Sequence, residues 1–505
     1  MKGGVPIVGT VGERLLATRM ATEALSLRTH EPWRAVATLV LVSISVALAA
    51  LTATSADSRL ALVLPLAAAA GLVLGVLALT RFAVYVQLLL IVRASLDFAQ
   101  VSWSAGENDL SVRALDPSSL FAVLFLVTAA LWLTAQSRRR GQLPSSPLRR
   151  ALTAFALAGL LSMLGTSDVG ATSIELLRIL AAVMMFAVLE QLMLDPMRMR
   201  TMLRAVYLSA IFPLAFTLAD VVSGSPRSEA KGDFVRLLGP FNQSNTFGRY
   251  LMLLIVFGVA ILPRLDRTNR RMLAVLLGIS SVFLVLTYTR SALIGTVLGL
   301  LVIGLLQDKR VLLALLIVVT LFVVFDPTLG ARFTELGGED SVVATDSRDS
   351  LQWRFQRWGE ILTLSNEDPI IGIGLATTQR VTEEEKQPHN DFVRTFVEMG
   401  VIGFIAYVVV LVSLLRLGWR AAKNTPAGSF EQGVGIGFLG CAVAFVAVSL
   451  VANVISNVVT LWYFLAFAAA ASAVVLRVRS TEYERVPASA PIEGARNQEE
   501  EASSP

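Results

Sequence analysis

The chain has 505 residues, of which 55% are hydrophobic and only 16% are charged, whereas a soluble domain carries roughly 45–50% apolar and about 25% charged residues. One cysteine, Cys441, excludes a disulfide framework and a zinc ribbon, and two histidines, His30 and His389, exclude a histidine-rich metal site. The net charge of +5 is typical of the basic loops of a membrane protein, so we expect membrane lipids rather than nucleic acid as partners. This composition predicts an all-α polytopic membrane protein.

Apolar runs between charged breaks predict about 12–14 transmembrane helices, since one crossing takes about 20 apolar residues. Before the first run lies a basic cytoplasmic segment, residues 1–34, in which 13–28 form either an amphipathic surface helix or part of a disordered arm. Clusters of Arg and Lys alternate between the runs and place both ends of the chain in the cytoplasm. The runs lie near residues 35–54, 60–80, 82–97, 118–136, 151–165, 174–194, 205–222, 242–262, 272–288, 291–306, 311–325, 396–416, 432–452 and 455–476.

These runs divide the chain into a transmembrane bundle, residues 35–325, and C-terminal transmembrane helices, residues 396–477. Between them, after the eleventh predicted span, residues 326–395 form one large polar loop, which the alternation places on the extracytoplasmic side. Within this loop, 349–364 has apolar residues at helical spacing. Because so long a loop is more often functional than decorative, we predict that it is catalytic. Residues 478–505, rich in Pro, Ala and Glu, are expected to form a disordered cytoplasmic tail.

Four arginines lie within or at the ends of predicted spans, where a charge is costly. They are Arg93, Arg178, Arg249 and Arg290, and the predicted topology places all four toward the outer face. Each one taken alone could extend its charge to the interface by snorkelling. Because outward arginines run against the positive-inside bias, a shared anionic ligand explains the set better, and guanidinium groups pair bidentately with phosphate.

Two of these arginines belong to polar motifs. In Gly239–Arg249, a stretch rich in Gly, Pro and Asn, Asn245 and Arg249 are four residues apart and therefore share a helix face. A helix cap would account for Asn242 or Asn245 but not for Arg249. In Thr287–Ser291, Arg290 divides two short apolar runs, either as a plain outer turn or as part of a binding site.

The large loop contains His389, which stands immediately before the next span. An imidazole suits proton abstraction from a hydroxyl near neutral pH. The alternative is a structural histidine beside Asx residues that cap a helix. Glu398 follows about 2.5 helical turns later and faces away from His389, so we expect a structural group rather than the base. Because no outward Asp, Glu and His cluster has metal-ligand spacing, we predict no metal site.

These motifs become specific when their order is considered. Gly239-Pro240-Phe241-Asn242 with Asn245 is followed by Thr289-Arg290-Ser291-Ala292, then by Arg354–Trp358 and Asp368–Gly374, and finally by His389-Asn390 and Phe396–Gly403. Over about Gly239 to Phe404, this order resembles the O-antigen ligase and O-antigen polymerase superfamily of bacterial membrane proteins.

The resemblance implies a glycosyltransferase that uses neither a metal nor another cofactor, and attack opposite the leaving diphosphate would make it inverting. Such an enzyme moves a glycan from a polyprenyl (undecaprenyl or decaprenyl) diphosphate carrier to an acceptor on the outer face of the bacterial cytoplasmic (inner) membrane, in the biosynthesis of cell-envelope polysaccharide. By motif, His389 matches the proposed base, Arg290 matches a catalytic arginine, and Arg354 or Arg357 matches a loop arginine that binds the diphosphate.

The remaining site residues come from topology or from the neighbourhood of the motifs. Arg249 and Arg178 are added as diphosphate ligands by their outward position, Asn245 and Asn390 are expected to contact substrate, and Gly372 and Gly374 are expected to be structural. Two departures from the family pattern concern substrate identity more than chemistry. The stretch after Gly374 lacks the usual third glycine and aromatic residue, and Arg394 stands where a neutral residue is expected.

Ligase and repeat-unit polymerase share these motifs, so both activities stay open, as do the glycan and the acceptor. A transporter or flippase of lipid-linked oligosaccharides would use the same arginines without chemistry. Such a protein should carry ionisable residues deep in its spans, whereas the candidates here gather on the outer side. A non-catalytic scaffold for envelope assembly would make His389 dispensable.

Overall fold

A computed structural model of the chain describes residues 71–103, 117–224, 226–231, 234–325, 351–381 and 388–485. The chain forms two compact parts, Met1–Val86 and Gln87–Pro505. Of the first part, the structure describes the apolar helix Gly71–Thr80 and the beginning of α4. The predicted basic segment 1–34, the first predicted span, the first part of the large loop and the end of the predicted tail lie outside the described residues.

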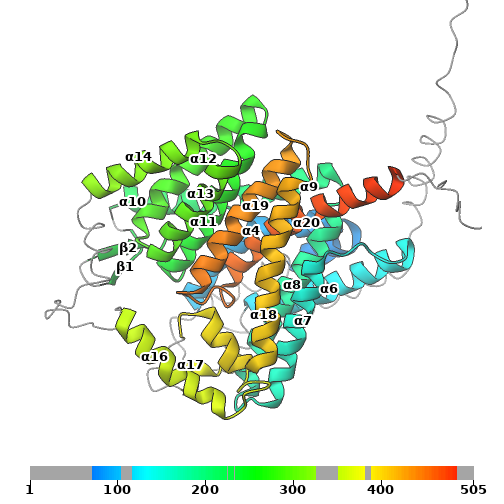
Figure 1. The fold of residues 1–505 in the computed structure, drawn as a ribbon, viewed down its shortest axis with the longest axis vertical. Coiled ribbons are helices and arrows are strands. Elements are labelled where there is room, and N and C mark those ends of the chain that lie inside the picture. Colours follow the sequence, from blue (N-terminus) through cyan, green and yellow to red (C-terminus); the bar gives the residue numbers. More distant parts are fainter. Residues whose placement is uncertain are drawn as a thin grey trace, which may run out of the picture. The chain divides into compact units, whose positions relative to one another are not determined.

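The described elements are helices, with one short antiparallel hairpin (Figure 1). The hairpin pairs β1 (Ser228–Lys231) with β2 (Phe234–Leu237). The helices are α4 (Phe82–Trp103), α6 (Pro117–Arg140), α7 (Pro147–Leu161), α8 (Val169–Leu192), α9 (Pro196–Leu208), α10 (Ile211–Val222), α11 (Ser244–Ile261), α12 (Arg267–Leu286), α13 (Arg290–Leu306), α14 (Arg310–Phe325), α16 (Leu351–Thr363), α17 (Thr378–Val381), α18 (Asp391–Lys423), α19 (Phe430–Ser449) and α20 (Val458–Arg485).

Within the described residues, eight helical segments are long and apolar enough to cross a membrane. They are Pro147–Leu164, Val169–Leu192, Pro196–Val222, Ser244–Arg264, Arg267–Leu286, Asp391–Lys423, Phe430–Ser449 and Val458–Ser480, and Gly71–Thr80, Phe82–Ser95 and Arg290–Leu306 are apolar but shorter. The predicted fold class, an all-α polytopic membrane protein, is confirmed. The total of 12–14 spans stays a prediction.

One predicted span, near 205–222, is built from two helices, α9 and α10, with a break at Ser209 and Ala210. Pro213 explains the break, because its ring would clash with the carbonyl of Ser209 in a continuous helix. Pro213 instead occupies the first turn of α10, where a proline needs no hydrogen-bond partner for its nitrogen.

The core of the bundle depends on close contact between helices. A Cβ on Gly299 of α13 would lie 3.2 Å from the carbonyl oxygen of Gly440 of α19. A Cβ on Gly440 would lie 2.9 Å from the carbonyl oxygen of Gly299. Paired small residues let the two backbones touch, as is usual for membrane helices. Beside them, Phe257 of α11 stacks on Phe467 of α20 with ring centroids 3.9 Å apart.

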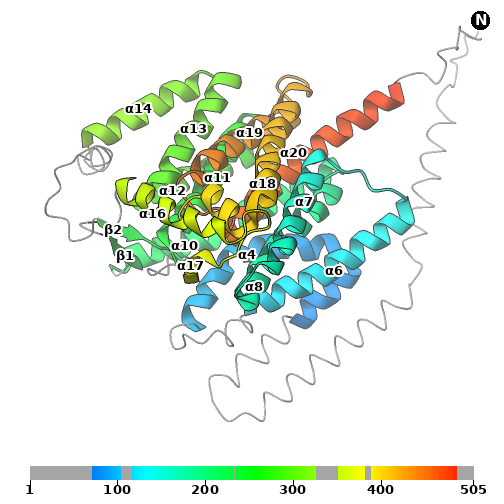
Figure 2. The same ribbon diagram turned by 60° about the horizontal axis from the view of Figure 1, so that its bottom comes forward.

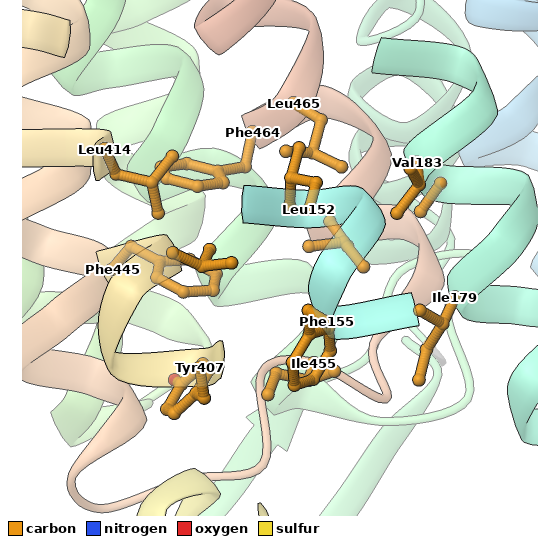
Figure 3. Close-up of a pocket in the computed structure, with 13 residues that line it drawn as sticks. Leu152, Phe155, Ile179, Val183, Tyr407, Leu414, Phe445, Ile455, Phe464 and Leu465 are labelled. Carbon is orange, nitrogen blue, oxygen red and sulfur yellow. The ribbon is translucent and has the colours of Figure 1, made fainter. Parts of the chain in front are cut away.

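A small apolar cavity of about 40 Å³ lies between α7, α8, α18, α19 and α20. Figure 3 shows Phe155, Tyr407 and Ile455 at one end of it and Phe464 and Leu465 toward the other. Because a water in the liquid occupies about 30 Å³, this cavity has no room for an organic ligand. It is a gap in the packing rather than a binding site.

Helix α18 is interrupted at Gly400, whose φ of 62° is left-handed. In a continuous helix the amides of residues 401 and 402 would donate to the carbonyls of Val397 and Glu398. Instead, the N–H of Val401 donates to Pro369 O at 3.0 Å and the N–H of Ile402 donates to Ile370 O at 3.3 Å.

The two carbonyls freed in this way accept from the same segment. Val397 O accepts from the N–H of Ile373 at 3.1 Å, and Glu398 O accepts from the N–H of Gly374 at 3.0 Å. Residues 369–374 therefore insert into the kink and satisfy all four backbone groups that the kink exposes. Figures 1 and 2 both show α16 and α17, which flank this segment in the chain, at the end of the bundle where α18 begins.

We predict that Gly400→Ala destabilises the protein by at least about 2 kcal/mol, because alanine is strained at positive φ and its Cβ would lie 2.2 Å from Ile370 O. Thermal unfolding in detergent measures the effect. The matched control is Gly278→Ala in α12, where a Cβ meets nothing within 4 Å and where alanine is the better helix former. Equal melting temperatures for the two variants would contradict the role assigned to the kink.

Candidate active site

Helix α16 confirms the helix predicted within 349–364 and lies against the beginning of α18. The indole Nε1 of Trp358 donates to Pro388 O at 2.7 Å. Ile361 packs with Ile373 and Val397 in a small buried cluster. These contacts fix the residue before His389 to a helix that comes from the middle of the large loop.

His389 is exposed and has a left-handed φ of 51°. Directly after it, Asn390 caps α18, since its Oδ1 accepts from the amides of Phe392 at 2.8 Å and Val393 at 3.2 Å. The N–H of Asn390 donates to Oδ1 of Asn453 at 3.0 Å. The helix cap that the sequence offered as an alternative is thus present at Asn390, directly after the exposed His389.

Asp391, the next residue, connects α18 to the loop between α19 and α20. This carboxylate is buried, and its Oδ2 accepts from the amides of Val454 at 2.9 Å and Ile455 at 3.3 Å. Further along the same loop, Nδ2 of Asn457 donates to Oγ1 of Thr246 at 2.6 Å. The loop therefore joins the beginnings of α18 and α11, a connection that the sequence analysis did not predict.

Arg236 in β2 is a central residue that the sequence analysis missed. Its Nε donates to Thr287 O at 3.0 Å, and its Nη2 donates to Asn245 Oδ1 at 2.7 Å and to Thr289 Oγ1 at 3.1 Å. Its Nη1 lies 3.2 Å from Oε1 of Glu229 in β1. Asn245 is therefore bound to Arg236, and this one guanidinium holds the start of α11 against the turn that precedes α13.

Arg290 begins α13 directly after this turn and is half-buried. The turn can approach α11 because Gly248 has no side chain, since a Cβ there would lie 2.9 Å from Cβ of Thr289. Hydrogen bonds of Arg236, Asp391 and the loop before α20 thus bring the motifs around 239–249, 287–291 and 388–391 to one region.

Arg249 differs from the other arginines of this region. It is buried, with 7% of its surface exposed, and its Nε has no hydrogen-bond partner. Among the described residues, Arg249 makes neither a hydrogen bond nor an ion pair, although Asp391 and Arg236 are close enough for their charges to act on it. A buried guanidinium without a partner is costly, so this group is ready to accept an anion.

Arg357 of α16 is also buried and only partly paired. Its Nη1 contacts Oε2 of the exposed Glu360 at 3.1 Å, while Nε and Nη2 have no hydrogen-bond partner. Arg354 lies on the same helix, and its side chain is not among those that the structure describes. The large loop therefore contributes at least one guanidinium with unused donors.

A second group of charges surrounds Arg394. Its Nη2 lies 3.0 Å from Oε1 of Glu175 in α8, and its Nε lies 2.9 Å from Oε2 of Glu398. Glu398 also accepts from the N–H of Ala376 at 2.9 Å and from the hydroxyl of Thr378. Arg178 pairs with the other oxygen of Glu175 at 3.2 Å, and 46% of its side chain is exposed. Arg394, which departs from the family pattern, has two carboxylate partners here.

Gly372 and Gly374 lie in the segment that this group holds in place. Both have left-handed φ, 79° and 100°. A Cβ on Gly372 would lie 2.4 Å from the backbone carbon of Glu398, so the close approach of the segment to α18 requires glycine. Within the described ranges, no group of three or more His, Cys, Asp or Glu side chains is placed to hold a metal ion.

Residues 273–408 match the family model described as O-antigen ligase. The chain carries an O-antigen ligase domain. This match confirms the resemblance seen in the sequence motifs and indicates a ligase- or polymerase-type glycosyltransferase family. No curated protein matches the chain.

The O-antigen ligase domain covers roughly a quarter of the chain, from α12 into the first half of α18. It contains Arg290, Arg357 and His389, whereas Arg236 and Arg249 lie outside it. Residues outside the domain complete the candidate active site. Arg236 contacts Thr287 and Thr289 of the domain, and the loop before α20 contacts Asp391.

We predict that Arg394→Met lowers the free energy of unfolding by roughly 3–5 kcal/mol, because Glu175 and Glu398 would keep buried charges without their shared partner. Arg178→Met is the matched control, since it removes a more exposed partner of the same Glu175 and should cost under about 1 kcal/mol. Denaturant unfolding in mixed micelles compares the two. Equal losses of unfolding free energy in the two variants would show that Arg394 is not the centre of this group.

Proposed function

We propose that the protein transfers a glycan from a polyprenyl diphosphate, such as an undecaprenyl or decaprenyl carrier, to an acceptor hydroxyl on the outer face of the bacterial cytoplasmic membrane. The observation that supports this most strongly is the buried guanidinium of Arg249, which has no partner among the described residues. An anion would remove the cost of this buried charge, and a diphosphate offers the oxygens that pair best with guanidinium.

Other groups of the region add positive potential. Helices α11, α13, α18 and α20 begin here or next to the loop that joins them. The N-terminal end of a helix carries a partial positive charge and free amides, which favour phosphate. Arg290 stands at the first position of α13, and Arg357 brings two unused donors from the loop.

The reaction we propose is one displacement. The acceptor oxygen attacks the anomeric carbon of the glycan, and the bond from that carbon to the diphosphate oxygen breaks with its electron pair. The hydroxyl proton passes to the imidazole of His389 and then to water. The leaving diphosphate keeps its negative charge against Arg249, Arg290 and Arg357, and preorganised charge of this kind is commonly the largest contribution to catalysis. Attack opposite the leaving group inverts the anomeric centre.

Transport of the lipid-linked glycan without chemistry fits the structure less well. A transporter needs its ionisable groups near the middle of its spans, whereas His389 is exposed and precedes α18. Ligation and polymerisation use the same chemistry and differ only in the acceptor. An assay of transfer therefore has to supply both a lipid acceptor and a second lipid-linked glycan.

We predict that His389→Ala lowers the transfer rate by about 10²–10⁴-fold while donor binding stays intact, because a general base typically accelerates a reaction by this factor. Arg249→Met should weaken donor binding itself. The measurement is product formation in reconstituted vesicles with a polyprenyl-diphosphate oligosaccharide, together with binding of the same donor. His30→Ala and Arg310→Met, at an N-terminal histidine and an exposed arginine of α14, are the matched controls.

Unchanged transfer by His389→Ala would remove the proposed base. If the wild type binds the donor but forms no product with either the lipid acceptor or the second lipid-linked glycan, the result would support a transporter instead. Full donor affinity in Arg249→Met would show that the diphosphate binds elsewhere.

A separate prediction concerns metal ions. If arginines stabilise the leaving diphosphate, transfer should proceed at an unchanged rate after extensive treatment with EDTA, and added Mg²⁺ or Mn²⁺ should not raise it more than about two-fold. Loss of activity with EDTA and its recovery with one of these ions would contradict this account of the leaving group.

A further inference from the structure

A groove of about 250 Å³ opens at the far end of the bundle from the candidate active site. Its lining comes from α9, α10, the end of α11, α12 and the start of α19. The apolar part includes Leu208, Ile211 and Met272, which are 46%, 54% and 66% exposed. The charged part includes Arg200 and Arg204 of α9. The groove is thus lined by both exposed apolar side chains and arginines.

The position of the groove follows from α11. The first residue of this helix, Ser244, lies next to the candidate active site, and its last, Ile261, lines the groove. At 1.5 Å per residue, the 18 residues of α11 separate the candidate active site from the groove by about 26 Å. This is close to the thickness of the hydrocarbon layer of a bilayer, so the groove and the candidate active site face opposite sides of the membrane.

The end of the bundle around the groove is strongly basic. Besides Arg200 and Arg204, this end carries four arginines between the end of α11 and the second turn of α12, namely Arg264, Arg267, Arg270 and Arg271. Basic residues at the ends of spans mark the cytoplasmic side of a membrane protein, and the cytoplasmic leaflet carries anionic lipids that attract such residues.

Three acidic residues near the groove have partners of their own, and one of them, Glu431, lies 4.0 Å from Nη2 of Arg477. Asp266 lines it and caps α12, where its carboxylate accepts from the backbone and side-chain nitrogens of Asn269. Asp195 lies 3.7 Å from Nε of Arg198. Arg200 is held over the ring of Phe430, with its guanidinium carbon 4.2 Å from the ring centroid. Arg204 is exposed and has no ion-pair partner among the described residues. The groove therefore has a net positive charge available to a ligand.

We propose that this groove binds an anionic phospholipid of the cytoplasmic leaflet. The phosphate of the headgroup lies against Arg200 and Arg204, and the upper part of an acyl chain lies along Leu208, Ile211 and Met272. The combination of arginines with exposed apolar side chains in one groove matches the two chemically distinct parts of such a lipid. This site is independent of glycan transfer, since it lies at the other end of the bundle.

The test is native mass spectrometry of the full-length protein titrated with phosphatidylglycerol or phosphatidylcholine of the same chain length. The wild type should bind phosphatidylglycerol at least ten-fold more tightly. Arg204→Gln should weaken phosphatidylglycerol binding about five-fold, since one basic residue near a membrane surface contributes about that factor. Arg271→Gln, an exposed arginine of the same face that does not line the groove, is the matched control and should bind as the wild type does.

Met272→Trp tests the apolar part of the lining separately, because the larger indole fills the groove from an exposed position. It should reduce phosphatidylglycerol binding with all arginines intact, and soluble glycerol phosphate should not bind to any variant. Equal affinities for the two lipids would overturn the proposal, as would equal losses in Arg204→Gln and Arg271→Gln. Full binding in Met272→Trp, or binding of glycerol phosphate alone, would show a general attraction of anions to the basic face rather than a lipid site.

Discussion

The candidate active site depends on the exchange of backbone hydrogen bonds at Gly400. The kink in α18 frees two amides and two carbonyls, the carbonyls at the buried residues Val397 and Glu398, and residues 369–374 satisfy all four. Backbone groups left unpaired at this kink would be costly. The segment and the helix therefore form one unit, which Glu398 strengthens through the amide of Ala376 and the guanidinium of Arg394. Since His389 stands directly before α18, its position is set by the same unit.

Charge in this region is distributed unequally between two groups of arginines. Arg394 and Arg236 have carboxylate partners. Arg394 joins α18 to α8, and Arg236 joins the start of α11 to the turn before α13. Arg249 and Arg357 keep buried nitrogens without partners among the described residues. Paired charges give the region a fixed geometry, while unpaired ones leave binding capacity for an anion. We therefore propose that a phosphate group enters a geometry that is already fixed.

The sequence predicted the fold class and most described helices, because the apolar length of a crossing is fixed by the bilayer. The helix within 349–364 was predicted from the spacing of its apolar residues. Arg236 was not predicted, since its partners come from three separate segments and a four-residue strand has no strong pattern. Arg394 stood out only as a departure from a family pattern, because its partner Glu175 is 219 residues away in the chain. The kink at Gly400 lies in a recognised motif, but only the structure shows the segment that fills it.

The central claim is that Arg249 binds the diphosphate of a lipid-linked donor. The most direct measurement is a cryo-electron microscopy map of the protein in nanodiscs with a polyprenyl diphosphate bound. The account predicts that one phosphate lies within hydrogen-bond distance of the guanidinium of Arg249, on the side of α11 that faces His389. A map in which both phosphates are held by other residues, while Arg249 remains without an anion, would contradict it.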